Sequence, residues 1–363
     1  MSDIVLRNVS RLFGGVAAVN DISMTFPEGS VTCLLGPSGC GKTTLMRMIA
    51  GLEMPTSGRI LFGDRDVTSH PAGKRNVSMV FQYPVMYRTL SVEQNIALPL
   101  QRDRSLDAAG CRQRTDEVLE VMQLHHCRTA HMQDLDVGTR QRVAVARAIA
   151  RSCDVVLFDE PTTNIEVHAK LELIRAFKSY RSKLRQTVIY VTHDQTEAMT
   201  LADRIALMQS GAILQCAPPR MLYEQPDSEF GGWFLGNPGM NFLVPAAEES
   251  GTLRLEALAS QLRSPAGGSD GLRLGIRPER IVIGPASSRG VIGRVIRRTI
   301  TIGGQYLLLI RIGETTLRAR AACGTSFVPG DDVSVLCPLD HLAFFRHGQR
   351  LPDPLELVEG SHV

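Results

Sequence analysis

The nine residues 36-GPSGCGKTT-44 constrain the fold of this 363-residue chain more than any other stretch. They match the pattern G-x-x-x-x-G-K-T, follow the apolar run 31-VTCLL-35 directly and precede the helical stretch LMRMIAG. Such glycines let backbone N–H groups close around a phosphate, and the helix that follows presents its positive end to the anion. Lys42 is predicted to reach the β- and γ-phosphates, and Thr43 to bind magnesium. The residues of this predicted phosphate loop are Gly36, Pro37, Ser38, Gly39, Cys40, Gly41, Lys42, Thr43 and Thr44.

Short β-rich runs alternate with helical patterns from residue 1 to about residue 235. Such alternation favours a parallel sheet covered by helices. Between about residues 84 and 150 the pattern is mostly helical, as in 116-DEVLEVMQL-124, whose apolar residues share one helical stripe. We therefore expect an α/β core with a helical insert. The predicted core strands are 31–35, 77–81, 155–158, 188–192 and 205–208.

The sequence changes character after 236-GNPGMN-241. From there strand patterns dominate, and glycine and proline punctuate them, which suits a small β-barrel. We therefore predict two domains, residues 1–236 and residues 237–363, of which the second is all-β. The predicted strands of the second domain are 253–258, 272–276, 291–296, 306–310 and 333–337.

Polar side chains follow three of the predicted core strands. Asp159 and Glu160 end the apolar run 155-VVLF-158, while His193 and Gln82 follow two other strands. In open α/β sheets, ligands collect at the carboxyl ends of the strands. Asp159 suits a magnesium site, Glu160 suits polarising an attacking water, and His193 suits contact with a γ-phosphate. Gln82 is neutral and can bind magnesium or water. Each of these strand-end residues is a weak signal alone, so the prediction rests on their occurrence together with the phosphate loop.

Charge and composition identify no macromolecular partner. Basic residues number 40 and acidic residues 37, and they are mixed along the chain without the basic blocks of a nucleic-acid binder. The N-terminus MSDIVLRNVSRLF carries an acid where a secretory signal is apolar, and no apolar run approaches the roughly 18 residues that cross a bilayer. The eight cysteines are scattered without a C-x-x-C pair, so we expect neither a zinc site nor disulfides, and a reducing cytoplasm.

These residues, together with FDEPTTN and YVTHDQTEAMTLADRIALM, resemble the ATP-binding-cassette ATPases over the whole first domain. The resemblance implies ATP hydrolysis, with ATP and Mg²⁺ as cofactors. It implies that Phe13 stacks on adenine, that the phosphate loop holds the phosphates and that Asp159 serves magnesium. It also implies Glu160 as catalytic base, His193 as sensor of the γ-phosphate, and Gln82 as the link between the γ-phosphate and the membrane subunits.

The C-terminal part, with 275-GIRPE-279, resembles the oligonucleotide-fold (OB-like) regulatory domain of maltose-type carbohydrate-importer ATPases. This resemblance, shared by residues 221–243, implies a carbohydrate, polyol or glycerol-phosphate as cargo. It implies two integral membrane permease subunits, an extracytoplasmic solute-binding protein as an indirect partner, and a peripheral place on the cytoplasmic face of the inner membrane. The stretch 83-YPVMYRTLS-91 is predicted to dock on the membrane subunits, with packing inside the helical insert as the alternative.

One segment departs from the family. There, two cassettes pair head to tail, and each ATP is closed between the phosphate loop of one and the signature LSGGQ of the other. Aligned on the downstream QRVAVARAIA, the signature segment of this chain (residues 135–139) reads LDVGT, so only the leucine and the second glycine survive. Asp136 stands where the serine is, and Val137 adds a β-branched side chain where the first glycine allows close approach. Gly138 and Thr139 complete the segment.

Asp136 raises the question of how this segment meets a phosphate. A carboxylate about 4 Å from a phosphate charge is repelled by roughly 4 kcal/mol at an effective dielectric near 20. Asp136 suits a helix N-cap equally well, which explains the fold but leaves the phosphate site impaired. Arg140 could pair with Asp136 or reach a phosphate itself, and the sequence leaves these alternatives open.

A second departure lies in the seam loop, residues 163-TNIE-166, where the family usually has aspartate at the position of Glu166. This loop, with Asn164, is implied at the dimer seam. One half-site is thus intact and the other altered, which favours a heterodimer with a second cassette ATPase of normal signature over a homodimer. The alternatives are a weakly hydrolytic or regulatory cassette subunit and, less favoured, a soluble cassette ATPase outside transport. The intact Lys42, Glu160 and His193 argue against a regulatory role.

Overall fold

The computed structural model describes residues 3–102, 106–163, 165–181, 186–247, 252–255, 257, 262–263, 269–301, 303–322 and 324–352. The chain divides into two compact units, Met1–Arg220 and Met221–Val363. The domain boundary predicted between residues 236 and 237 lies 16 residues after this division, beyond the short helices α7 and α8. The predicted boundary remains a proposal. Each unit is described by itself below.

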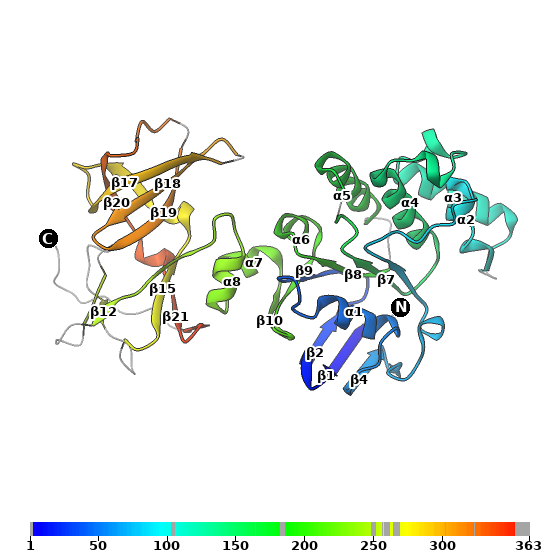
Figure 1. The fold of residues 1–363 in the computed structure, drawn as a ribbon. Coiled ribbons are helices and arrows are strands. Elements are labelled where there is room, and N and C mark those ends of the chain that lie inside the picture. The colour runs from blue at the N-terminus through cyan, green and yellow to red at the C-terminus, as the bar shows by residue number, and fades with distance from the viewer. Residues whose placement is uncertain are drawn as a thin grey trace. The chain divides into compact units, whose positions relative to one another are not determined.

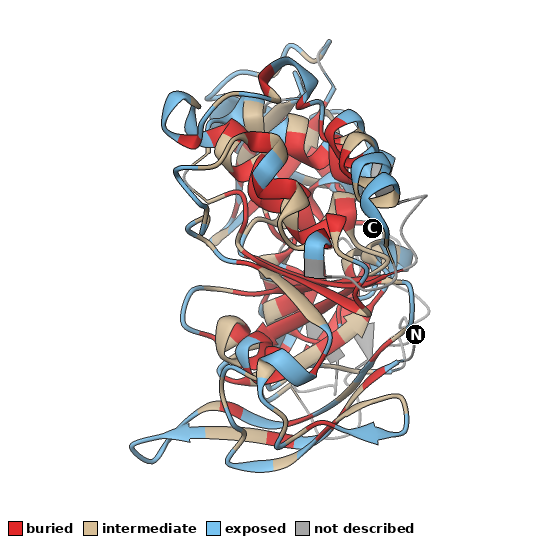
Figure 2. Ribbon diagram, turned by 90° about the vertical axis from the view of Figure 1, so that its right-hand side faces the viewer, coloured by how far each residue is buried: buried red, intermediate tan, exposed pale blue. Residues whose placement is uncertain are grey.

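A six-stranded sheet forms the centre of the first unit (Figure 1). Its order is β10-β9-β3-β8-β7-β6, and every neighbouring pair is parallel except the edge pair β10 and β9. Strands β3, β7 and β8 are buried at every position, as the red strands of Figure 2 show, because both faces of the sheet are covered. The predicted helix-covered parallel sheet is confirmed. The strands are β3 Val31–Leu35, β6 Val77–Val80, β7 Val155–Asp159, β8 Thr187–Thr192, β9 Arg204–Gln209 and β10 Ala212–Ala217.

A second, antiparallel sheet precedes the first in the chain, and the sequence patterns described above did not predict it. Its order is β2-β1-β4-β5. It shares one apolar core with the central sheet, and that core includes Phe26 of β2, Leu45 and Met48 of helix α1, and Leu157 of β7. Helix α1 is thereby held between two sheets (Figure 1). The elements are β1 Ile4–Phe13, β2 Val16–Phe26, α1 Lys42–Ala50, β4 Ser57–Phe62 and β5 Arg65–Asp66.

Helices cover the other face of the central sheet (Figure 1). Several begin at a side chain that accepts a hydrogen bond from the first turn: Ser91 at α2, Asp107 at α3, Asp136 at α4 and Asp194 at α6. The helical insert predicted at about residues 84–150 is present as α2, α3 and α4. The helices are α2 Val92–Ala97, α3 Ala108–Val121, α4 Val137–Ala150, α5 Val167–Arg181 and α6 Gln195–Leu201, with 3-10 turns η1 Ala72–Lys74, η2 Leu100–Arg102, η3 His125–Cys127 and η4 Met132–Asp134.

The second unit is β-rich, as predicted. Its five-stranded sheet has the order β16-β20-β17-β18-β19, and a four-stranded sheet has the order β11-β15-β21-β22. Both contribute to one apolar core, for example through Leu274 of β15 and Leu308 of β18. The predicted strand 253–258 overlaps β13 and lies partly outside the described residues. The elements are α7 Pro219–Glu224, α8 Glu229–Phe234, β11 Asn241–Leu243, β12 Ala246–Ala247, β13 Thr252–Arg254, β14 Leu262–Arg263, β15 Leu272–Ile276, η5 Pro278–Arg280, β16 Val282–Pro285, β17 Val291–Ile300, β18 Tyr306–Ile312, β19 Thr315–Ala321, β20 Asp332–Leu336, η6 Leu339–His341, β21 Ala343–Arg346 and β22 Gln349–Arg350.

The arginine of the GIRPE segment anchors the helical start of the second unit to its sheet. Arg277 is 5% exposed and donates hydrogen bonds to the carbonyls of Gly232, Leu235 and Tyr223. Its guanidinium also lies 3.9 Å from the centre of the Tyr223 ring. Burial lowers the pKa of Arg277, while its two terminal nitrogens donate to these three carbonyls. The role of this segment seen here is therefore structural.

Candidate functional site

The phosphate loop joins β3 to α1 and is shaped by its glycines. Gly41 is the N-cap of α1 with φ of 103°, a conformation that favours glycine, and a Cβ there would lie 2.1 Å from the Ala18 carbonyl oxygen. Helix α1 has no side-chain cap at this end, so its first backbone N–H groups face the loop without a competing acceptor from the N-cap. Lys42 is 4% exposed and donates to the carbonyls of Gly36 and Pro37 at 2.8 and 2.9 Å. The loop thus gathers a cation and a helix N-terminus at one point.

Two predicted magnesium ligands lie together at the edge of the sheet. The hydroxyl of Thr43, in the first turn of α1, donates to a carboxylate oxygen of Asp159 at 3.0 Å. Asp159 ends β7 and is 5% exposed, and burial raises its pKa above the ordinary value for aspartate. A buried carboxylate beside a hydroxyl is a hard oxygen pair, which suits Mg²⁺. Among the described residues no group of three or more His, Cys, Asp or Glu side chains forms a closed metal cage.

Glu160 and His193 are also brought into contact. Glu160 has φ of 46°, which is unusual for a residue with a side chain, and its N–H donates to Val191 at 3.0 Å. One carboxylate oxygen lies 3.1 Å from both His193 Nδ1 and the Thr163 hydroxyl. Parallel pairing of β7 with β8 explains the meeting, because both residues follow the carboxyl ends of neighbouring strands. The contacts to Glu160 come from two segments, the end of β8 through Val191 and His193 and the loop after β7 through Thr163.

Gln82 and Phe13 lie outside these contacts. Gln82 is half-buried, two residues beyond the end of β6. Phe13 ends β1 with 47% of its surface exposed, and the guanidinium of Arg11 lies 4.6 Å from the centre of its ring. An exposed ring with one open face can stack on a base, but no described contact joins Phe13 to the phosphate loop.

The stretch 83–91 after Gln82 mixes exposed with half-buried residues. Tyr83, Val85 and Tyr87 are 72%, 68% and 49% exposed. Beside them lies a cavity of about 300 Å³ whose lining includes β6, Val85 and Arg147 of α4. Asn95 is fully buried and holds the loop at Tyr87. Its side-chain oxygen accepts the Tyr87 N–H at 3.1 Å, and its side-chain nitrogen donates to the Tyr87 carbonyl at 3.1 Å. The loop backbone is therefore held at Tyr87, while Tyr83, Val85 and Tyr87 expose apolar surface.

The signature segment carries its own anion. Asp136 is the N-cap of α4, and its carboxylate accepts the Thr139 N–H at 2.9 Å and the Thr139 hydroxyl at 2.6 Å. These bonds lower the pKa of Asp136, so the side chain is ionised at neutral pH. Val137 is 56% exposed beside it. Arg140 donates to the Gln133 carbonyl at 3.3 Å.

Packing against α5 explains why this segment keeps one glycine. A Cβ on Gly138 would lie 2.6 Å from the Cβ of Ala169 and 3.5 Å from the seam-loop residue Ile165. Thr139 is 4% exposed and accepts a hydrogen bond from Arg142, which in turn reaches Glu172 of α5. The start of α4 and the seam loop are therefore neighbours within one chain. Glu166 of that loop is exposed, and Asn164 lies outside the described residues.

Two buried polar clusters escaped the sequence analysis. Arg75 is 1% exposed and donates to carbonyls at the end of α1, those of Met48 and Ile49, at 2.7 and 3.0 Å. Glu197 is fully buried under α5 and is bound by Lys170 at 2.7 Å. Isolated charges in a sequence give no signal for such roles. The spacing 194-DQTE-197 signals only the start of α6, which Asp194 caps, because the Glu197 side chain binds Tyr190 and Thr192 and not the N-cap backbone.

Comparisons with known proteins place this arrangement in a family. The model of the ABC transporter family matches residues 19–163. The chain is 40% identical to the Fe(3+) ions import ATP-binding protein FbpC of Agrobacterium fabrum over 83% of this chain and 85% of that protein. The chain belongs to the ABC importer ATPases.

Further relatives agree. Maltose/maltodextrin import ATP-binding protein MalK of Yersinia pestis is 36% identical over 87% of this chain and 85% of that protein. The sn-glycerol-3-phosphate import ATP-binding protein UgpC of Cupriavidus pinatubonensis is 35% identical over 97% of this chain and all of that protein. CbiO1 of Clostridium perfringens, described as part of the ABC transporter complex CbiONQ, matches with a TM-score of 0.56 and 26% identity over 60% of this chain and 89% of that chain.

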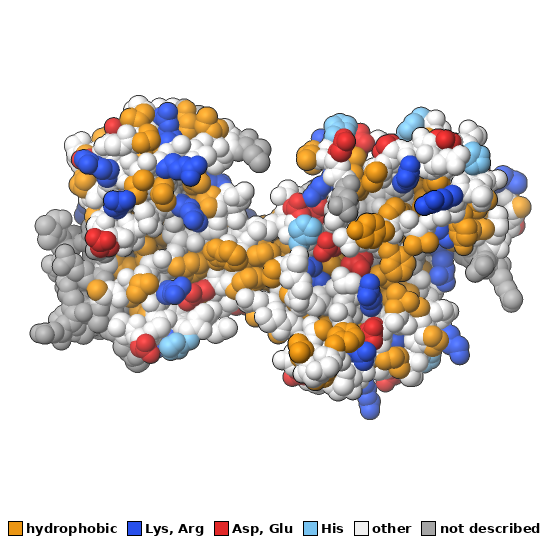
Figure 3. Space-filling view, viewed as in Figure 1, with side chains coloured by type: hydrophobic (Ala, Val, Ile, Leu, Met, Phe, Trp, Pro, Cys, Tyr) orange, Lys and Arg blue, Asp and Glu red, His pale blue; other side chains and the backbone are white. Residues whose placement is uncertain are grey.

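As an ABC importer ATPase the chain binds and hydrolyses ATP. No helix among its described residues is long and apolar enough to cross a membrane. Basic and acidic side chains are interspersed on the face of the first unit shown in Figure 3.

Proposed function

We propose that this ABC importer ATPase is the hydrolytic half of an asymmetric pair. Its phosphate loop, Glu160 and His193 would turn over ATP against a normal signature on a second cassette subunit. The partner's ATP would face Asp136 and turn over slowly. The observation that carries the proposal is the contrast between a Glu160–His193 contact of 3.1 Å and a signature segment whose second residue, Asp136, is an ionised carboxylate.

On the intact side, each side chain has a proposed role. Lys42 would bind the β- and γ-phosphates, and Thr43 and Asp159 would hold Mg²⁺, with Gln82 completing its sphere. The metal ion supplies charge neutralisation on the phosphate oxygens. Glu160 would accept the proton of the attacking water.

His193 and Phe13 would act beside that centre. His193 binds Glu160 through Nδ1, which leaves its other ring nitrogen to contact the γ-phosphate. Phe13, exposed at the end of β1, would stack on adenine. Together these residues form one complete half-site.

On the altered side, electrostatics argue against ready closure. A helix N-terminus carries about half a positive charge, which the Asp136 carboxylate offsets. The Thr139 N–H is already bound by that carboxylate at 2.9 Å. A homodimer would repeat this arrangement at both sites. A heterodimer, with Glu166 and Asn164 at the seam, would confine it to one.

The membrane side of the proposal rests on the exposed side chains of the stretch 83–91. Its outward aromatic side chains and the cavity beside it suit docking of two permease subunits at the cytoplasmic face of the inner membrane, with a solute-binding protein acting outside. The relatives are named for import of Fe(3+), sn-glycerol-3-phosphate and maltose. We propose a carbohydrate, polyol or glycerol-phosphate as cargo. Stimulation of the assembled ATPase by Fe(3+) with its binding protein, and by none of these organic solutes, would contradict that cargo.

The pairing is tested by purifying the chain alone and together with the second cassette subunit. We expect phosphate release from the pair to exceed that from the lone chain, and Glu160→Gln in this chain to abolish most of it. Glu120→Gln, an exposed glutamate on α3, is the matched control. Vigorous hydrolysis by the lone chain, abolished by Glu160→Gln, would rule out the need for a heterodimer.

A further inference from the structure

A buried carboxylate under α5 is bound by four donors from three different segments. Glu197 is fully buried. One oxygen accepts hydrogen bonds from Thr192 at 2.7 Å and Tyr190 at 3.2 Å. The other binds the hydroxyl of Thr162 and the ammonium of Lys170, the latter at 2.7 Å. The carboxylate therefore has the partners that a buried charge requires.

The same ammonium also holds the turn that carries His193. Lys170 Nζ lies 2.5 Å from Asp194 Oδ2. The other oxygen of Asp194 accepts the N–H groups of Thr196 and Glu197, which fixes the start of α6. Burial alone would lower the pKa of Lys170, but its bonds to Asp194 and Glu197 outweigh burial and raise it. Lys170 is thus a charged bridge between α5 and this turn.

The residues bound by Lys170 or by Glu197 include three that lie close in sequence to the proposed hydrolytic residues. Thr162 lies two residues after Glu160, and Thr192 and Asp194 flank His193. Lys170 lies in the first turn of α5, and its N–H bonds the carbonyl of Glu166 in the seam loop at 2.9 Å. Contacts therefore run from the seam loop to the backbone of Lys170, from its ammonium to Asp194 beside His193, and through Glu197 to Thr162 in the segment that carries Glu160.

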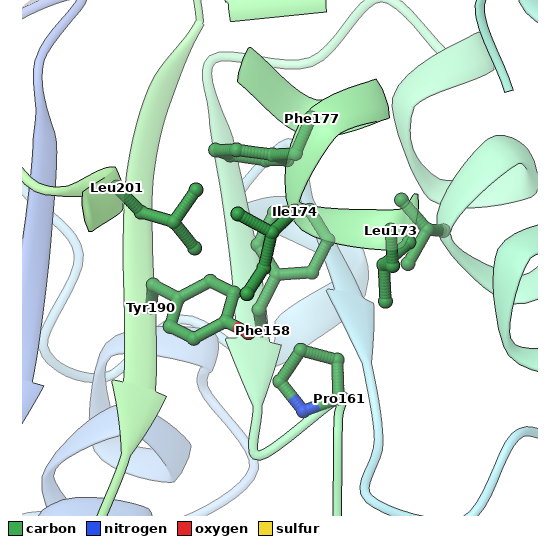
Figure 4. A pocket seen from close by; sticks show the side chains of 8 residues that line it. Phe158, Pro161, Leu173, Ile174, Phe177, Tyr190 and Leu201 are labelled. Carbon is green, nitrogen blue, oxygen red and sulfur yellow. The ribbon is translucent and has the colours of Figure 1, made fainter. Parts of the chain in front are cut away.

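Apolar packing alone does not fix α5 in this way. Figure 4 shows Leu173, Ile174 and Phe177 of α5 lying over Phe158 and Tyr190 of the sheet. The Phe158 and Phe177 rings meet edge to face with centroids 5.4 Å apart. The space between these side chains is only about 10 Å³, too small for a ligand. The aliphatic contacts are non-directional and the aromatic pair prefers an orientation only loosely, whereas hydrogen bonds define distance and angle more narrowly.

We propose that Lys170 is a positioning residue that couples the seam loop to the Glu160–His193 pair by binding Asp194 and Glu197 together. The inference rests on the proposed roles of Glu160 and His193. Closure of the partner against the seam loop would then set the geometry of the hydrolytic pair through α5. In this role Lys170 acts through Asp194 and Glu197.

The test compares three variants in the assembled ATPase. Lys170→Met keeps the length of the side chain and removes its charge, Lys170→Arg keeps the charge, and Lys178→Met removes an exposed lysine from the same helix. We expect Lys170→Met to lower kcat about 10-fold while KM for ATP changes less than about 2-fold, because misplacement affects the transition state and not ground-state binding. Lys170→Arg should restore most of kcat, and Lys178→Met should match wild type.

A second variant covers the case in which Lys170→Met does not fold. The double variant Lys170→Met/Glu197→Gln removes one charge of each sign and keeps an amide for the hydroxyl donors. We expect it to fold and to show the same loss of kcat. An unchanged kcat in folded Lys170→Met or in the double variant overturns the coupling, as does a loss that appears equally in KM or is not rescued by arginine. If Glu160→Gln hydrolyses ATP as fast as wild type, the proposed function fails. Failure of the proposed function is thereby distinguished from failure of the Lys170 coupling.

Discussion

Helices α1 and α4 both begin in a segment that the family uses to bind phosphate, yet their first residues are opposite in character. The N-cap of α1 is Gly41, which has no side chain to bind the first turn. The N-cap of α4 is Asp136, whose carboxylate bonds the Thr139 N–H. A helix N-terminus attracts anions only if no anion of its own is already there. Under the proposed function, the N-cap would determine which of these two helix ends receives ATP readily.

The largest expected effect comes from giving α1 a side chain at its N-cap. In Gly41→Ala the new Cβ would lie 2.1 Å from the Ala18 carbonyl oxygen, at a φ of 103° that disfavours alanine. We expect ATP affinity to fall at least about 100-fold, which corresponds to roughly 2.7 kcal/mol. Titration with a fluorescent nucleotide measures it. Gly73→Ala, where nothing lies within 4 Å, is the control and should bind ATP normally. If Gly41→Ala binds ATP with wild-type affinity, the absence of a side chain at the N-cap of α1 is not what allows this helix end to bind phosphate.

A second experiment restores the other helix end. Asp136→Ser with Val137→Gly removes the carboxylate and the exposed β-branched side chain. With Glu160→Gln in the same chain, the remaining phosphate release of the pair reports the partner's ATP alone. We expect that release to rise about 10-fold, since a charge pair near 4 Å is worth up to roughly 4 kcal/mol at an effective dielectric near 20. Val137→Gly alone separates the steric part from the charge. If the double change leaves the rate unaltered, Asp136 does not limit that site.

The central sheet could be predicted because its strands are short apolar runs followed by polar site residues. The phosphate loop, Asp159, Glu160 and His193 then fell at one edge by topology alone. The antiparallel sheet of β1, β2, β4 and β5 was missed because its strands are only partly buried and their burial does not follow a simple alternation. Its register shifts further blur the period of two.

The contacts among buried charged residues behind the site could not be predicted for a different reason. Lys170, Asp194 and Glu197 are ordinary surface residue types, and their burial follows from how α5 lies on β8. Likewise, the bond between Asp136 and Thr139 was one of the alternatives that the sequence left open. Side-chain geometry decided it: Thr139 supplies both an N–H and a hydroxyl, whereas Arg140 bonds Gln133.

A smaller effect, on the free energy of unfolding, separates the capping hydrogen bond of Asp136 from its negative charge. Asp136→Ala removes both, and we expect the free energy of unfolding to fall by about 1 kcal/mol, whereas Asp136→Asn should cost only a few tenths because asparagine caps nearly as well. For a unit of this size the alanine variant should melt about 2–4 °C lower. Differential scanning calorimetry measures the shift, with Asp64→Ala on an exposed turn as the control. Equal losses in the alanine and asparagine variants would mean that the charge, rather than the cap, stabilises α4.

The smallest expected effect is on the pH dependence of that stability. The hydroxyl and the N–H of Thr139 lower the pKa of Asp136 in the folded chain below the unfolded value of about 3.9. The stabilising contribution is therefore fully present above about pH 4 and is lost as the pH falls through the lower, folded pKa. The difference in melting temperature between wild type and Asp136→Asn should stay constant from pH 8 to about pH 5. Below about pH 4 the melting temperature of wild type should fall relative to that of Asp136→Asn. Because Asp136 remains charged across the neutral range, mild acidification should not relieve its repulsion of the partner's ATP. A difference that changes between pH 6 and pH 8 would instead assign the titration to another group and leave the charge of the signature segment in question.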